Sequence, residues 1–141
     1  MAERSAKKLA RIHRVRSLQL GQVQAQEAHA QARLAQEAAL RRRIDALAAN
    51  VQPSSAPALA TSLAASAHFR ERLRHTAEAA DRRVEVAQQG LEDARAATRE
   101  AKRDQTAVEK LIARHEADAA LAALRALEAL PPVRGNRHDP C

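Results

Sequence analysis

The residues of this chain best suited to bind a metal ion or transfer a proton are its six histidines, which are scattered along the sequence. No histidine lies four residues from another, and no Glu-x-x-His pair of the di-iron type occurs. The closest group is His68 and His75, two helical turns apart with Glu71 between them, and solvated side chains on a helix surface account for it. We therefore expect no metal centre.

Other catalytic patterns are also missing from the sequence. It contains no Gly-rich phosphate loop and no nucleophile elbow, and Cys141 is its one cysteine. A single cysteine forms no internal disulfide and suits a reducing compartment. The longest apolar runs are only a few residues, too short for a membrane span or a secretory segment. We expect a soluble protein without a cofactor and without enzymatic activity.

The element that carries three of the six histidines, His68, His75 and His115, is indicated by an unbroken 3-4 alternation of mostly apolar or small side chains. It comprises Leu73, Ala77, Ala80, Val84, Ala87, Leu91, Ala94, Thr98, Ala101, Gln105, Val108, Ile112, His115, Ala119 and Ala122. This spacing is that of a coiled-coil seam about seven heptads long. Three of its members, Thr98, Gln105 and His115, are polar, and they either fix the register or partner choice of a packed pair or face solvent or a partner.

One strong break divides the chain. Pro53 ends a first helix, Ser54 or Ser55 can cap a second, and Pro57 is tolerated in its first turn. The sequence predicts an all-α fold, a long antiparallel two-helix coiled-coil hairpin with a longer second helix. Its expected segments are a first helix over 3–51, a turn over 52–57, a second helix over 58–130 and a disordered tail over 131–141.

Folding the chain about this turn pairs residues whose numbers add to about 109, which places Val23 near 84–87 and Leu9 near Ala101. The second helix then has an overhang from about residue 107 that keeps large apolar side chains in water. The same pairing brings Gly21 and Gly90 to one level of the hairpin. The two glycines there mark a soft joint in the rod, a place where another backbone approaches closely, or two tolerated surface positions.

Positive charge is concentrated at the beginning of the chain, whose net charge is +7. The first 16 residues contain one acid, Glu3, and six cations: Arg4, Lys7, Lys8, Arg11, Arg14 and Arg16. A nucleic-acid site would lack aromatic side chains, and a membrane-surface helix would carry Arg16 in its apolar face. An acidic protein surface fits this end best.

The chain resembles the FliJ-like flagellar export proteins and their virulence-secretion counterparts of the YscO type over about residues 3–130. The resemblance rests on the basic opening 7–16, on the unequal antiparallel hairpin, and on the stretch 103–111, a basic segment followed by Glu-Lys-Leu. The chain departs from the family in its short, breaker-rich tail after Leu130 and in the scarcity of large side chains in its first helix.

The resemblance implies a cytoplasmic adaptor or chaperone-like component of the type III export apparatus. It would engage a hexameric export ATPase and the export gate protein, with export chaperones as further partners, and reach the inner membrane only through its partners. The ATPase-binding residues that it implies are Lys7, Lys8, Leu9, Arg11, Ile12, Arg14, Val108, Lys110, Leu111 and Ile112. The gate-binding residues are Phe69 and Leu73 near the turn, where plain packing within the hairpin is an equal alternative for Phe69.

Two other functions remain open from the sequence. A homodimeric structural coiled coil would cover the overhang with a second copy, and the chain could equally be the stalk protein of a virulence secretion system. We do not expect nucleic-acid binding.

Overall fold

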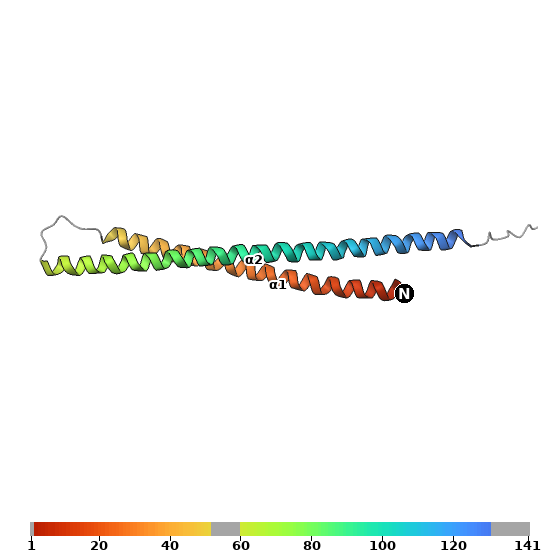
Figure 1. Ribbon diagram of the computed structural model, residues 1–141, viewed down its shortest axis with the longest axis horizontal. Helices are drawn as coiled ribbons and strands as arrows, with labels where there is room; N and C mark the ends of the chain where they lie inside the picture. Colours follow the sequence, from red (N-terminus) through yellow and green to blue (C-terminus); the bar gives the residue numbers. More distant parts are fainter. Residues whose placement is uncertain (1, 52–59, 131–141) are drawn as a thin grey trace, which may run out of the picture. The chain divides into compact units, whose positions relative to one another are not determined.

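A computed structural model of the chain describes residues 2–51 and 60–130. It contains two helices, α1 (Ala2–Asn50) and α2 (Ala60–Glu128), which are 49 and 69 residues long. No strand occurs in these two ranges. The all-α fold with a longer second helix, predicted from the 3-4 spacing, is confirmed (Figure 1).

The helix ends agree closely with the sequence. α1 ends three residues before Pro53, as expected because proline disfavours helical geometry in the residue before it. Val51 N donates a hydrogen bond to Ala48 O at 3.3 Å, and Leu130 N donates one to Leu127 O at 3.2 Å, so both helices finish in a tighter turn. The expected turn at 52–57 and the tail at 131–141 lie outside the described residues.

The chain forms two compact units. Unit 1 consists of Met1–Ser17 with Arg103–Cys141, and unit 2 is Leu18–Lys102. In unit 2, Glu27 pairs with Arg95 whereas the later residue Arg41 pairs with the earlier Asp81, so the two helices run antiparallel. In unit 1, His13 pairs with Glu109 and Arg16 with Asp104, which gives the same direction.

The predicted seam of α2 is confirmed from Leu73 to His115. Every one of its members in that range is buried or half-buried, whereas Ala119 and Ala122 are exposed. Few of the described residues are buried, and two of them are alanines: Ile44, Ala80, Ala87, Leu91 and Val108. Two helices alone cannot enclose a thick core, so the seam depends on close contact between small side chains.

The predicted register is wrong. In unit 2 Thr98 Oγ1 lies 3.5 Å from Val23 O, whereas the sequence had placed Val23 near 84–87. The ion-paired residues of this unit have numbers that add to 120–122 instead of 109. A seam repeats every seven residues, so apolar spacing alone fits several registers equally well.

Side-chain volume helps to select the observed register. It sets Leu34 level with Ala87 and Ala30 level with Leu91, so that a large side chain on one helix faces a small one on the other. Alternating large and small residues across a packed pair fills space without voids. A slip of two heptads would set Leu34 against Leu73 and Ala30 against Ala77, which packs less evenly.

The two glycines do not share a level. In the observed register Gly21 stands level with Glu100 and Gly90 with Gln31. A Cβ atom at either glycine would meet nothing within 4 Å, so no neighbouring backbone approaches closely. The tolerated-surface interpretation holds for both. Within the described ranges, neither helix contains a stretch apolar enough to cross a membrane.

Candidate interaction surfaces

The start of α1 presents one strongly basic surface in unit 1. Its members are the five exposed cations Arg4, Lys7, Lys8, Arg11 and Arg14, called here the basic face. Spacings of three and four residues place side chains on one side of a helix, so these five cations share a face. The seam residues Ser5 and Leu9 lie on the opposite side and are half-buried. The basic face therefore points away from α2.

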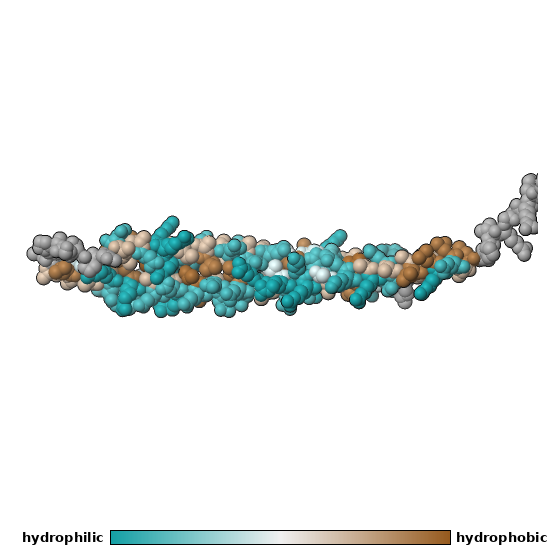
Figure 2. Space-filling model, turned by 90° about the horizontal axis from the view of Figure 1, so that it is seen from above, coloured by the Kyte–Doolittle hydropathy of each residue, from teal (hydrophilic) through white to brown (hydrophobic). Residues whose placement is uncertain are grey.

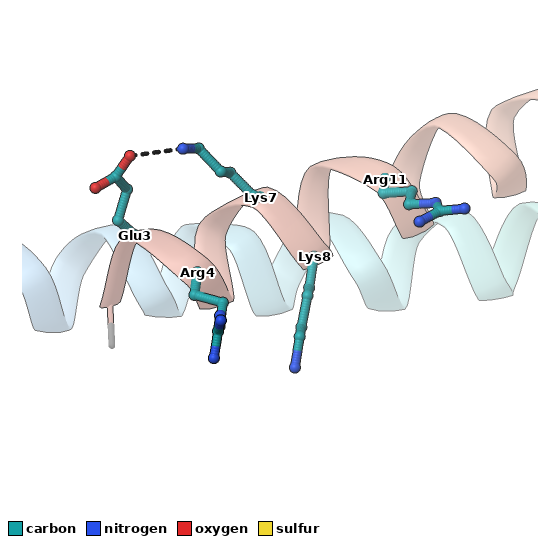
Figure 3. A pocket seen from close by; sticks show the side chains of 5 residues that line it. All are labelled: Glu3, Arg4, Lys7, Lys8 and Arg11. Carbon is teal, nitrogen blue, oxygen red and sulfur yellow. Dashed lines mark hydrogen bonds and ion pairs between the residues drawn. The ribbon is translucent and has the colours of Figure 1, made fainter.

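Little negative charge is available to neutralise the basic face. Figure 3 shows Lys7 reaching back to Glu3, and their ion pair measures 2.7 Å from Nζ to Oε1. Arg4, Lys8 and Arg11 project from the same helix in that view. Both side chains of the Lys7 pair are more than three-quarters exposed, so water screens the pair strongly.

The α2 segment of unit 1 is covered much further than expected. Val108 is only 8% exposed, and Ile112 and His115 are half-buried, so the predicted overhang from about 107 is wrong. In the observed register Leu9 stands level with Ile112 and His13 level with Val108. His13 Nε2 lies 3.4 Å from Glu109 Oε1, and Arg16 pairs with Asp104 at 2.9 Å.

The uncovered part of α2 in this unit begins at Glu116, from which every residue to Leu130 is exposed. Its large side chains, called here the terminal leucines, are Leu121, Leu124, Leu127 and Leu130. Figure 2 shows them as a brown surface over the last turns of α2, next to the grey atoms. Four leucines more than half exposed within three turns are more apolar surface than a monomer usually leaves in water.

The residues implied for the ATPase-facing end therefore separate into three groups. Lys7, Lys8, Arg11, Arg14 and Lys110 are exposed, and Ile12 and Leu111 are about half exposed. Leu9 and Ile112 belong to the seam. Val108 is buried and cannot contact a partner while the two helices stay paired.

At the other end of α2, in unit 2, Phe69 is 49% exposed and Leu73 is half-buried at the seam. The register makes α1 end level with about residue 71. The first turns of α2 thus extend past α1, with Leu63 also 52% exposed (Figure 1). The extra length of α2 leaves turns without a partner helix at both of its ends.

Charged residues within the α1 seam are a feature that the 3-4 spacing did not predict. Arg16 and Glu27 both lie at the seam and pair across it. The cross-seam pairs of unit 2 are Glu27 with Arg95 at 3.8 Å, Glu37 with Arg83 at 3.8 Å, and Arg41 with Asp81. Opposite charges at matched heptad positions on the two helices would have revealed them.

Two of the polar seam residues have visible partners. Thr98 Oγ1 donates to Ala94 O at 3.1 Å within α2. Gln105 Nε2 donates to Glu109 Oε1 at 3.0 Å, the same oxygen that His13 approaches. His115 is half-buried. All three lie along the packed seam, which favours the register-fixing alternative over plain solvent exposure.

Of the histidine cluster singled out in the sequence, His75 belongs to a surface charged group on α2 of unit 2, and His68 is exposed. His75 Nε2 lies 3.1 Å from Glu71 Oε1, and Arg74 pairs with the same oxygen at 2.9 Å. The hydrogen bond and the charge of Arg74, with a smaller effect of His75, lower the pKa of the Glu71 carboxyl below its ordinary value. Within 2–51 and 60–130 no group of three metal-binding side chains comes together.

Known proteins offer no guide to these surfaces. No family model, no curated protein and no solved structure matches the chain.

Proposed function

We propose that this protein is an adaptor of a flagellar type III protein export apparatus that engages the hexameric export ATPase through unit 1 and the export gate through the first turns of α2. The proposal starts from the family resemblance of the sequence. As an adaptor the chain organises or stimulates the ATPase and does not hydrolyse ATP itself. It acts in the cytoplasm and reaches the inner membrane export machinery through these partners, with export chaperones as further candidates.

The observation that carries this proposal is the set of terminal leucines. They are 51–64% exposed on the part of α2 that lies beyond its packed seam, which α1 covers from Leu73 to His115. Burying one such side chain in an interface typically contributes about 2–5 kcal/mol, more than tenfold in affinity. The basic face, on the same unit, adds long-range attraction toward an acidic partner.

The test is a double change, Leu124→Ser/Leu127→Ser, assayed for stimulation of the export ATPase and for pull-down by it. Both leucines lack a packed neighbour on α1, so the melting temperature of the free chain should stay nearly unchanged while stimulation falls more than tenfold. The matched control is Leu18→Ser/Val86→Ser, which alters two side chains that are 69% and 63% exposed in unit 2. Equal stimulation by wild type and the Leu124/Leu127 variant would refute the assignment.

A second candidate rests on the same leucines. A homodimeric structural coiled coil would cover them with a second copy of the chain, because an exposed leucine surface favours self-association. Sedimentation separates the two functions: a stable dimer at low micromolar concentration that the Leu124→Ser/Leu127→Ser change dissociates supports the structural role. A virulence secretion system is the further alternative, and a neighbouring gene for a flagellar or virulence export ATPase distinguishes the two.

A further inference from the structure

The cations of the basic face are spaced in a way that packing of the coiled coil does not require. Arg4, Lys8 and Arg11 follow one another at spacings of four and three residues, and like charges at these spacings destabilise a helix. The seam is formed by other residues of α1, so the cations add nothing to its packing. This unfavourable arrangement indicates an anionic ligand that neutralises it.

No acid within the described part of the chain supplies that neutralisation. The four acids of α1 are each engaged: Glu3 with Lys7, Glu27 with Arg95, Glu37 with Arg83, and Asp45 with Arg41. In unit 1, Asp104 and Glu109 of α2 are held by Arg16 and His13 at the seam, and the other described acids of this segment, Glu116, Asp118 and Glu128, form no ion pair with the basic face. Of the five cations, only Lys7 has an ion pair among the described residues.

The shape of the basic face limits the kind of ligand. The hollow beside it is lined by residues of α1 alone, so the face is the convex side of a single helix and not a groove between helices (Figure 3). The first and last cations are ten residues apart, about 15 Å along the helix axis. A straight, convex row of cations that points away from α2 can contact a flat anionic surface with all its members at once.

The basic face also carries an exposed apolar side chain. Val15, four residues after Arg11, lies on the same side of α1 and is 48% exposed. Ile12 beside it is 46% exposed. Exposed aliphatic side chains beside a row of cations suit a lipid headgroup layer, where the cations meet anionic headgroups. The face carries no aromatic side chain for base stacking, which disfavours a nucleic acid.

We propose that the basic face of α1 binds the surface of an anionic lipid bilayer directly. This goes beyond the adaptor function, in which membrane contact is made only through protein partners, and does not depend on it. Each Lys or Arg near an anionic leaflet contributes about fivefold in affinity, or ~1 kcal/mol. Five cations give a weak, reversible contact that would act together with a protein tether.

The experiment is co-sedimentation of the purified full chain, without ATPase, with vesicles of phosphatidylcholine and phosphatidylglycerol. Vesicles of phosphatidylcholine alone are the reference. We expect retention only by the anionic vesicles, and its loss when salt rises from about 0.1 M to about 1 M, because the Debye length falls from ~10 Å to ~3 Å. Equal retention by both kinds of vesicle, or none by either, overturns the proposal.

Two variants locate the contact. Lys8→Gln/Arg11→Gln should weaken vesicle binding by roughly 25-fold, since two cations are lost. Helicity and melting temperature should be kept or raised, because like-charge repulsion within α1 is relieved. The matched control, Arg114→Gln/Arg125→Gln, removes the same charge from exposed positions on α2 of the same unit and should bind within about twofold of the wild type. Equal weakening by both variants would mean that net charge, and not the basic face, drives binding.

A conservative exchange and a competitor distinguish other anionic ligands. Lys8→Arg/Arg11→Lys keeps the charge and should keep vesicle affinity, because a lipid surface does not require the fork of an arginine. A large loss on this exchange would indicate specific carboxylate or phosphate recognition and would overturn the proposal. Tighter binding to duplex DNA than to anionic vesicles at the same salt would overturn it in favour of a nucleic acid.

Discussion

Truncation of Leu91 tests the packing of α2 against α1 in unit 2. Leu91 is 5% exposed at a seam position that the observed register sets level with Ala30. Leu91→Ala removes three carbon groups that are almost fully withdrawn from water. At about 0.8 kcal/mol per buried carbon group, their transfer to water costs about 2.4 kcal/mol.

The cavity adds less to this cost than in a globular core. Both helices have solvent along most of their length and can close on a small void, so the total should lie near the lower limit of the usual ~2–5 kcal/mol for Leu→Ala. For a chain of this size, that destabilisation lowers the melting temperature by roughly 5–10 °C. Thermal unfolding followed by circular dichroism at several protein concentrations measures it.

The matched control is Leu124→Ala, at a side chain that is 55% exposed beyond the end of α1. Alanine has a slightly higher helix propensity than leucine, so we expect a change within about 0.5 kcal/mol. If Leu91→Ala costs no more than this control, the seam of unit 2 is not packed as described. If Leu124→Ala costs as much as Leu91→Ala, and the loss depends on concentration, then a second copy covers the terminal leucines.

Three further predictions concern the glycines, the register and the surface carboxyl. Gly21→Ala and Gly90→Ala should each stabilise the chain by about 1 kcal/mol, because the added Cβ meets nothing within 4 Å; a lower melting temperature in either variant would show a close neighbour. Spin labels at Val23 and Thr98 should lie side by side, whereas labels at Val23 and Ala87 should be separated by about 16 Å more along the helix axis. A shorter electron spin distance for the Val23–Ala87 pair than for the Val23–Thr98 pair would favour the register predicted from the turn. Arg74→Ala should raise the pKa of Glu71 toward its ordinary value, as measured by an NMR pH titration. Because the folded-state pKa is lowered, the pair contributes stability above the ordinary carboxyl pKa, and this stability is lost as pH falls through the lowered value. A titration curve that does not move in the variant would contradict this account.

The sequence by itself determined the secondary structure and the packed face of α2. A 3-4 alternation without proline can only be a long helix with one apolar stripe, and each seam member from Leu73 to His115 is covered in the structure. The concentration of positive charge at the start of α1 also follows from the sequence, whereas the pairing of Arg16 with Asp104 at the seam, which separates it from the basic face, does not.

Only the tertiary structure decided which residues of the two helices lie level with each other. A heptad pattern repeats, so it fits registers that differ by seven or fourteen residues, and the sequence reasoning selected one from the position of the turn. The observed register is set by the alternation of large and small side chains, as at Leu34 and Ala87, and by ion pairs such as Glu37 with Arg83. This choice removed Val108 from the candidate contact surface and left the terminal leucines exposed, because burial depends on how far α1 extends along α2.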